Sequence, residues 1–196
     1  MEDSSVSSFN YGEGTHILYC GNLGLIQNIE TIPEIMKHID NPDIQFHVIG
    51  MGPKSDTLVS LIKENGLEDK LIYHGPIPAK RAAAYFASAD VLYVSLKDEG
   101  YVGKTIPNKL VMSMAFAKPI IAVLGGDGRD VVLASKGGMV CDENKESIAK
   151  AINDMAALSP EERKKLGQLN QAYYQKHLSI ERVGEQVNQA LLEELL

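Results

Sequence analysis

The sequence predicts an α/β fold: a Rossmann-like, doubly wound sheet of six parallel strands with helices on both faces. Short apolar runs of strand length alternate along the chain with segments of helical period. Most of these runs are continuously apolar rather than alternating, which is typical of strands covered on both faces. A repeated strand-then-helix order predicts one parallel sheet between two helical layers.

The size and charge of the chain exclude several classes of protein. It has 196 residues, of which 44% are hydrophobic, and a formal net charge of −7. This composition excludes a disordered chain, and the acidic balance argues against a nucleic-acid binder. Lys118 and Pro119 split the longest apolar run, so we expect no membrane span. Cys20 and Cys141 are far apart without CxxC spacing and predict neither a disulfide framework nor a zinc site.

The chain divides into a short polar segment and one domain. Residues 1–14 are rich in Ser, Gly and Asn, so we expect a tail or linker there and a single Rossmann-like domain over 15–196. An acidic, polar start is no secretory signal, so we expect a cytoplasmic protein, with contact to the inner membrane face through a partner left open. The strands are expected over 16–20, 44–49, 71–74, 91–94, 119–124 and 138–141.

Glycine follows most of the expected strands. Gly21, Gly50 and Gly75 end the first three, and Gly125-Gly126 follows the fifth. In a parallel α/β sheet, ligands bind beyond the carboxyl ends of the strands, and glycine lets the backbone approach them closely. The alternative is that these glycines only make tight turns. Their shared edge favours a nucleotide-type pocket.

Two early helices carry clear local signals. Apolar residues at helical spacing cover 29–39, but Pro33 interrupts them, so we expect a kink, or a start near Thr31 with Glu34 completing a capping box. The next helix, around Leu58, should stop at Asn65-Gly66.

The later helices are predicted from capping residues and apolar stripes. Ser159-Pro160 with Glu162 is a capping box that should open a helix. Ser179 should cap the last helix, over 179–195. The stripes are Ile148, Ile152 and Met155 in one helix, and Ile180, Val183, Val187 and Leu191 in the last.

The segment 105–117 predicts a phosphate site. Pro107 and Asn108 form a polar turn that opens a short apolar helix, which Lys118-Pro119 ends. Amide groups at such a helix N-terminus point toward the ligand edge, and Lys109 adds positive charge.

A dinucleotide site is the weaker alternative. Gly50-Met51-Gly52-Pro53 could begin a G-x-G-x-x-G fingerprint, but Ser55 stands at the third glycine position and the motif follows the second strand. An NAD-dependent enzyme therefore stays a minor hypothesis. The sequence contains no P-loop motif and no metal-binding motif.

An ordered set of segments resembles the donor-binding C-terminal domain of retaining GT-B glycosyltransferases of family 4, in particular the capsule and colanic-acid type. The resemblance covers about residues 15–196. The segments are GNLGLIQ at 21–27, VIGMGP at 48–53, LIYHGPIP at 71–78, AYFASADV at 84–91 and TIPNKLVMSMAFAKPIIA at 105–122.

The resemblance implies a nucleotide-sugar site, for a UDP- or GDP-sugar, without cofactor or metal. Many members carry cations where this chain has Asn22 and Gln27, and glutamates for the ribose and the donor sugar where it has Met112 and Lys104. Arg129 is a further candidate for the missing charge. The implied donor-binding residues are Gly21, Asn22, Gly24 and Gln27 by the diphosphate, Gly50 and Gly52 in the second turn, His74, Gly75, Pro76 and Ile77 by the base, Asn108 and Lys109 at phosphate, and Lys104, Gly125 and Gly126 in the donor pocket.

The resemblance also implies an enzyme whose acceptor-binding domain is outside this chain. We expect the donor half of a transferase that builds a polysaccharide or glycolipid, and no catalytic residue is assigned. The last helix, 179–195, should pack toward that absent domain. The alternative is a non-catalytic subunit that binds nucleotide-sugar or docks on a partner chain.

Overall fold

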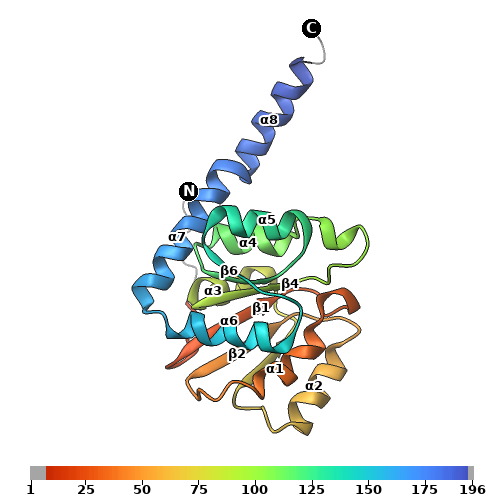
Figure 1. Ribbon diagram of the computed structural model, residues 1–196, viewed down its shortest axis with the longest axis vertical. Coiled ribbons are helices and arrows are strands. Elements are labelled where there is room, and N and C mark those ends of the chain that lie inside the picture. Colours follow the sequence, from red (N-terminus) through yellow and green to blue (C-terminus); the bar gives the residue numbers. More distant parts are fainter. Residues whose placement is uncertain (1–7, 194–196) are drawn as a thin grey trace.

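The computed structural model describes residues 8–193, and side chains as far as residue 189. Its centre is one sheet of six parallel strands in the order β3-β2-β1-β4-β5-β6 (Figure 1). The predicted Rossmann-like fold is therefore confirmed. The strands are β1 (Thr15–Cys20), β2 (Ile44–Ile49), β3 (Leu71–Gly75), β4 (Val91–Ser95), β5 (Ile120–Val123) and β6 (Gly138–Val140).

Helices cover both faces of the sheet because alternate strand residues point to opposite sides. Ile17 and Tyr19 of β1 pack into the core cluster on one face, and Leu18 packs into a cluster on the other. The first face is covered by α1 (Ile32–Met36), α2 (Ser55–Glu64) and α6 (Lys145–Ala157). The second is covered by α3 (Ala79–Ser88), α4 (Asn108–Ala115) and α5 (Gly126–Ser135), with α7 (Pro160–His177) packed on α4 and α5.

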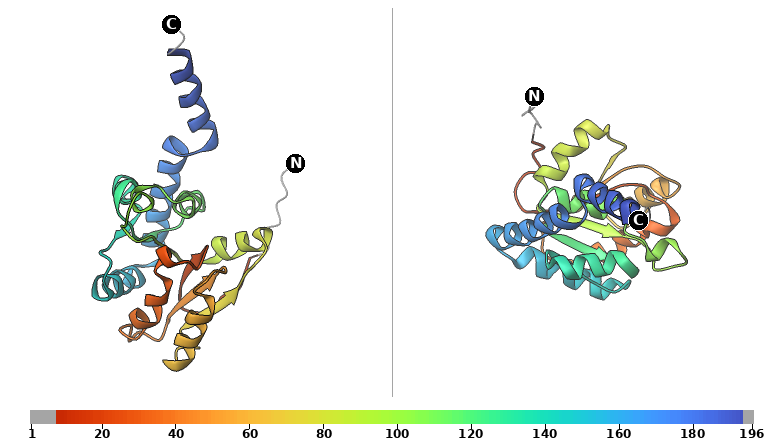
Figure 2. Two further views of the ribbon diagram at one scale, coloured as in Figure 1. Left: turned by 90° about the vertical axis from the view of Figure 1, so that its right-hand side faces the viewer. Right: turned by 90° about the horizontal axis from the view of Figure 1, so that it is seen from above.

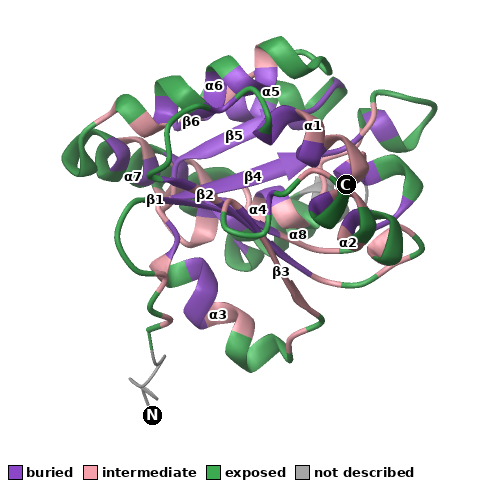
Figure 3. Cartoon of the chain, turned by 90° about the horizontal axis from the view of Figure 1, so that it is seen from below, coloured by how far each residue is buried: buried purple, intermediate pink, exposed green. Residues whose placement is uncertain are grey.

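Burial follows this layering. The inner strands β1, β2, β4 and β5 and the inward faces of the helices are buried, the edge strands β3 and β6 are mostly half-buried, and the outward faces of the helices are exposed (Figure 3). The stripe predicted for α6 is confirmed, since Ile148, Ile152 and Met155 all lie in the core. Three short 3-10 turns complete the secondary structure at Leu25–Gln27, Ile29–Thr31 and Val102–Lys104.

Most of the predicted helix ends are confirmed. Ser159 caps α7, since its side chain accepts a hydrogen bond from the Glu162 amide and the Glu162 carboxylate accepts one from the Ser159 amide. Asn65 follows the end of α2, and Gly66 has a φ of 61°.

The capping box expected at Thr31 was wrong. The chain first makes a 3-10 turn at 29–31, so Thr31 already has helical φ and ψ, and its hydroxyl donates back to the Asn28 carbonyl oxygen. Pro33 then lies in the first turn of α1, where a missing N–H costs little.

The segment before β1 lies on the second face of the sheet. Residues 8–14 contain no helix or strand. The Phe9 ring stacks on Tyr85 of α3, and the Tyr11 ring stacks on His16. These aromatic residues cover part of the sheet beside α3.

The last helix projects away from the rest of the domain. α8 (Ile180–Glu193) extends outward beyond α7 (Figures 1 and 2). The predicted cap is confirmed, since the Ser179 hydroxyl accepts a hydrogen bond from the Arg182 amide. Ile180 is 84% exposed, and Val183 and Val187 are exposed as well. Leu191, expected on the same stripe, lies outside the residues whose side chains are described.

Candidate functional site

The carboxyl edge of the sheet carries two depressions. The first lies between α3 and α4 beyond the end of β1, has a volume of about 420 Å³ and is called the α3/α4 pocket below. Among the residues predicted for donor binding, it brings together Gly21, Ile77 and Lys109. Its lining residues are Cys20, Gly21, Ile77, Ala79, Ala82, Ala83, Phe86, Lys109, Met112 and Phe116.

Lys109 supplies the positive charge of this pocket. Its Nζ donates to the Tyr19 hydroxyl at 3.0 Å and to the Ser95 carbonyl oxygen at 3.2 Å, and lies 4.6 Å from the centre of the Tyr19 ring. Burial lowers the pKa of the Lys109 ammonium to about 8, and Cys20 partly opposes that shift. No carboxylate neutralises Lys109 among the described residues. An anionic ligand would therefore meet a partly desolvated, unpaired cation.

The N-terminus of α4 faces the same edge. The helix begins at Asn108 after Pro107, and no side chain caps it. Asn108 is exposed, while Lys109 points inward to Tyr19. The sequence predicted a phosphate-binding site made of a helix N-terminus and a lysine, and this uncapped helix start beside Lys109 has that arrangement.

The rest of the α3/α4 pocket is apolar. Met112, at the position where many family members carry a glutamate, is 50% exposed and lines the pocket. The pocket contains no carboxylate and no side-chain amide. Ribose hydroxyl groups would find no side-chain oxygen acceptor on this wall.

The second depression, the β5/β6 pocket, lies beyond the ends of β4, β5 and β6 and has a volume of about 410 Å³. It contains the predicted Gly125 and Gly126. Lys104 is exposed and does not line it, but its backbone packs closely on Gly126. The lining residues are Leu96, Asp98, Val123, Leu124, Gly125, Gly126, Arg129, Cys141, Asp142 and Glu143.

Three predicted glycines pack against neighbouring backbone or side chains and line neither pocket. Gly50 has a φ of 140°, and a Cβ there would overlap the Gly21 carbonyl oxygen. A Cβ at Gly52 would lie 2.5 Å from the Leu23 carbonyl oxygen, and one at Gly24 would lie 2.6 Å from the Gln27 side-chain oxygen. These glycines let the turns after β1 and β2 fit together.

Asn22 and Gln27 have different surroundings. Asn22 is exposed at the edge, and its carbonyl oxygen accepts a hydrogen bond from the Tyr19 hydroxyl at 2.6 Å. Gln27 is buried, and its side-chain oxygen accepts a hydrogen bond from the Gly24 amide at 3.1 Å. Its role here is to close the turn between Gly24 and Gln27.

His74 belongs to a row of histidines on the second face of the sheet. His47 Nδ1 lies 3.0 Å from His74 Nε2, and His47 Nε2 lies 3.1 Å from His16 Nδ1. Burial lowers the pKa of His47 to about 3 and also lowers the pKa of His74. His74 lines neither pocket, and the half-buried Gly75 and the exposed Pro76 lead from it to Ile77.

Sequence reasoning missed the residues that build the walls. Tyr19 looked like one more apolar strand position, and nothing local indicates that its hydroxyl binds Lys109 from a helix far along the chain. In the α3 wall, the small side chains of Ala82 and Ala83 leave room beside the sheet, next to the larger Phe86. Small residues at helical spacing were the only available signal.

Metal clusters and membrane-spanning helices are absent from the part of the chain that the structure describes. No group of three or more His, Cys, Asp or Glu side chains there is arranged to hold a metal ion. No helix there is long and apolar enough to cross a membrane.

Comparison with known proteins identifies relatives. The chain is 32% identical over 146 residues to the "Probable glycosyltransferase WbjE" of Pseudomonas aeruginosa, covering 71% of this chain and 35% of that protein. It is 26% identical over 133 residues to a GDP-mannose-dependent alpha-(1-6)-phosphatidylinositol monomannoside mannosyltransferase of Mycolicibacterium smegmatis, covering 66% of this chain and 34% of that one. The chain thus spans about a third of the length of these curated relatives.

Solved structures support the fold. Anabaena Alr3699/HepE, crystallised in complex with UDP, aligns with a TM-score of 0.77 at 17% identity, covering 92% of this chain and 49% of that one. The sequence model of the family "Glycosyl transferases group 1" matches residues 1–172. The chain belongs to this family of glycosyltransferases.

Proposed function

We propose that this chain is the donor-binding half of a glycosyltransferase, which holds a UDP- or GDP-sugar at the carboxyl edge of its sheet. The observation that carries the proposal is the α3/α4 pocket, where Lys109 and the uncapped start of α4 meet an apolar cleft. A nucleotide base fits an apolar cleft, and a diphosphate fits a lysine beside free helix amides. The UDP complex of HepE and the GDP-mannose named for the mycobacterial relative support a nucleotide-sugar donor.

The transfer itself needs an acceptor-binding part. We infer that the sugar passes to a polysaccharide or glycolipid acceptor, with retention and without a metal, when this half joins an acceptor domain or partner chain. WbjE and the mycobacterial enzyme, which extend well beyond the matched segment, support this division. The capsule and colanic-acid subtype, the cytoplasmic location and the family 4 assignment remain predictions from the sequence.

Isothermal titration calorimetry with UDP, GDP, UDP-glucose and GDP-mannose tests donor binding. We expect one of the two nucleotides to bind, and Lys109→Met to weaken that binding about tenfold, because a charge-assisted contact to phosphate is lost. Lys176→Met, at an exposed position in the last turn of α7, is the matched control and should bind as the unchanged chain does. No binding of any of the four ligands at millimolar concentration would refute the proposal.

We further propose that α8 docks on the acceptor-binding part. Its stripe of Ile180, Val183 and Val187 is exposed along the first half of α8, the helix that projects from the domain. Val183→Asp with Val187→Asp should leave nucleotide affinity unchanged in this chain, measured by the same titration. Loss of nucleotide binding would instead assign α8 to the donor site.

A further inference from the structure

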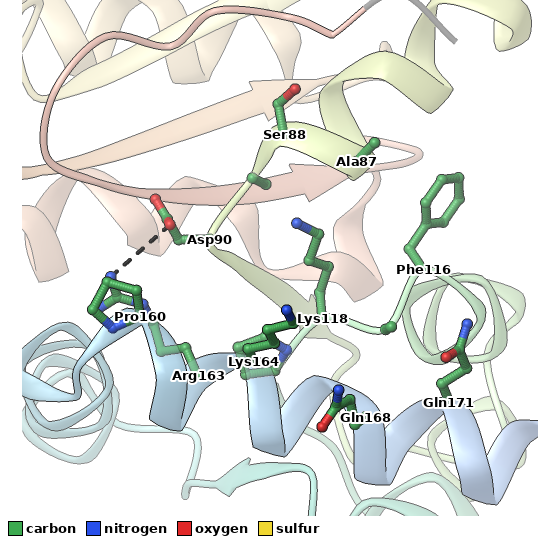
Figure 4. A pocket seen from close by; sticks show the side chains of 13 residues that line it. Ala87, Ser88, Asp90, Phe116, Lys118, Pro160, Arg163, Lys164, Gln168 and Gln171 are labelled. Carbon is green, nitrogen blue, oxygen red and sulfur yellow. Dashed lines mark ion pairs between the residues drawn. The ribbon is translucent and has the colours of Figure 1, made fainter. Parts of the chain in front are cut away.

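A third cavity lies at the opposite edge of the sheet, where β4 and β5 begin. It is formed between the C-terminal ends of α3 and α4 and the first half of α7, and its volume is about 550 Å³ (Figure 4). We call it the basal pocket. Its lining residues are Ala87, Ser88, Ala89, Asp90, Phe116, Ala117, Lys118, Pro119, Pro160, Arg163, Lys164, Gln168 and Gln171.

The basal pocket carries more positive than negative charge. Three cations, Lys118, Arg163 and Lys164, line it together with one carboxylate, Asp90. Asp90 is already engaged: its Oδ2 accepts a hydrogen bond from the His16 amide at 2.9 Å, and its Oδ1 lies 3.9 Å from Arg163 Nη2. The pocket therefore keeps a net charge of about two positive units, since three cations face one anion.

The two lysines are unpaired. Neither Lys118 Nζ nor Lys164 Nζ has a hydrogen bond or ion pair with any residue that the structure describes. Lys118 is half-buried, and burial lowers the pKa of its ammonium, partly opposed by Asp90. An ammonium that has lost part of its hydration without gaining a partner is stabilised when an anion binds beside it.

Arg163 is held rigidly in the wall. Its Nη1 donates to the carbonyl oxygens of Ala156 at 3.2 Å and Leu158 at 2.7 Å, while its Nε is buried without a partner. The guanidinium charge is thus fixed in place by the backbone at the end of α6. A fixed charge costs no side-chain entropy when a ligand arrives.

The remaining wall is part apolar and part polar. Phe116, Pro119 and Pro160 line it with the alanines of the α3 end, and Ser88, Gln168 and Gln171 add uncharged polar side chains. Figure 4 shows Lys118 between Asp90 and Phe116, and Lys164 below it on α7. A phosphate monoester carries nearly two negative charges at neutral pH. We propose that the basal pocket binds a phosphate monoester carried on a small apolar group, at a site separate from the nucleotide pocket.

The two pockets share one side chain. Phe116 lines both the basal pocket and the α3/α4 pocket, and its ring stacks on Phe86 with centroids 5.0 Å apart. The aromatic pair therefore separates the two cavities. A ligand in the basal pocket should bind at the same time as a nucleotide and not compete with it.

Phenyl phosphate is the test probe, because it joins a phosphate monoester to an aromatic ring. Titration followed by two-dimensional NMR should show saturable binding, with shifts around Lys118 and Phe116. Phenol and inorganic phosphate, each with half of the chemistry, should bind more weakly. The double substitution Lys118→Met with Lys164→Met should weaken phenyl phosphate binding by about tenfold or more. Lys165→Met, at the exposed neighbour that does not line the pocket, is the control and should bind normally.

Several results would overturn the proposal. One is equal affinity of the double variant and the unchanged chain, with both shown to be folded by their melting curves. Another is displacement of the probe by UDP or GDP, which would place it in the nucleotide pocket. Because the probe contains no nucleotide, its binding can succeed while donor binding fails, so the two proposals are tested separately.

The source of the phosphate can be distinguished with vesicles. Co-sedimentation with phosphatidylcholine vesicles that contain phosphatidic acid, lost in the Lys118→Met, Lys164→Met variant, would support a lipid headgroup. Phenyl phosphate binding without co-sedimentation would support a soluble phosphate ester. Failure of both probes to bind would refute the site.

Discussion

Lowering the pH from 7.5 to 5 should destabilise this domain through the histidine row. His47 lies on β2 between His16 and His74. The Tyr11 ring packs beside His47, and the Tyr85 ring packs beside His74. Burial, with smaller contributions from His74 and His16, lowers the pKa of His47 from 6.5 to about 3. The folded domain keeps His47 neutral, while the unfolded chain protonates it. Its contribution to stability is therefore full above pH 6.5 and is lost as the pH falls toward 3.

The magnitude follows from linkage. A histidine that titrates near 6.5 in the unfolded chain and stays neutral in the folded one reduces the free energy of unfolding by about 2 kcal/mol between pH 7.5 and 5. Burial lowers the pKa of His74 too, which adds in the same direction. For a domain of this size, about 2 kcal/mol corresponds to a fall of about 4–8 °C in Tm.

Urea denaturation at pH 5, 6 and 7.5 measures this effect. His47→Gln removes the titrating group. The free energy of unfolding should therefore fall by about 2 kcal/mol less between pH 7.5 and 5 in this variant than in the unchanged chain. His38→Gln, at an exposed position after α1, is the control and should keep the full dependence. The pKa values of Glu34 and Glu162 are lowered from 4.5 by hydrogen bonds to Lys37 and Ser159. Their contribution to stability is therefore lost mainly below pH 4.5, outside this range. The same pH dependence in His47→Gln and in the unchanged chain would refute the reasoning.

Three further outcomes are expected. Donor affinity should fall about tenfold between pH 7 and 9 as Lys109, with a pKa of about 8, loses its proton, and Lys109→Met should abolish this dependence in calorimetry. Met112→Glu should raise nucleotide affinity about fivefold, because the new carboxylate accepts a hydrogen bond from a ribose hydroxyl. A 2′,3′-dideoxynucleotide should gain nothing, and an equal gain for both nucleotides would contradict this explanation. Gly50→Ala should lower the free energy of unfolding, measured by urea denaturation, by about 3 kcal/mol or more, because its φ of 140° and the Gly21 carbonyl exclude a Cβ. Gly66→Ala, in open space at a φ of 61°, should lower it by only about 1 kcal/mol.

The fold could be predicted because its signals are local. Continuous apolar runs identified the strands to within one or two residues, and the parallel order followed from the helices between them. The Ser159 cap could be predicted because all of its hydrogen-bonding partners lie within three residues. Thr31 had the same local pattern, but the 3-10 turn before it had already placed its backbone in a helical conformation.

The residues that line the α3/α4 pocket were predicted only in part, because a glycine at a strand end has two uses. Gly21 and Gly50 follow adjacent strands, yet Gly21 lines the α3/α4 pocket while Gly50 packs against the Gly21 backbone. Which use applies depends on the register of β1 against β2, where Cys20 pairs with Ile49. That register is a property of the assembled sheet and cannot be deduced from either segment alone.

The surroundings of Lys109 explain how the α3/α4 pocket could hold a cation ready for a ligand. Its two hydrogen-bonding partners, the Tyr19 hydroxyl and the Ser95 carbonyl, are neutral oxygens. A phosphate oxygen carries negative charge and is the stronger acceptor, so it can take over the ammonium while Tyr19 keeps its bond to the Asn22 carbonyl. The exchange leaves no buried donor unpaired at either stage. The strand residue Tyr19 thus acts as a placeholder, and the loss of its hydroxyl in Tyr19→Phe would leave Lys109 with the Ser95 carbonyl as its described hydrogen-bond acceptor and with the aromatic ring beside it.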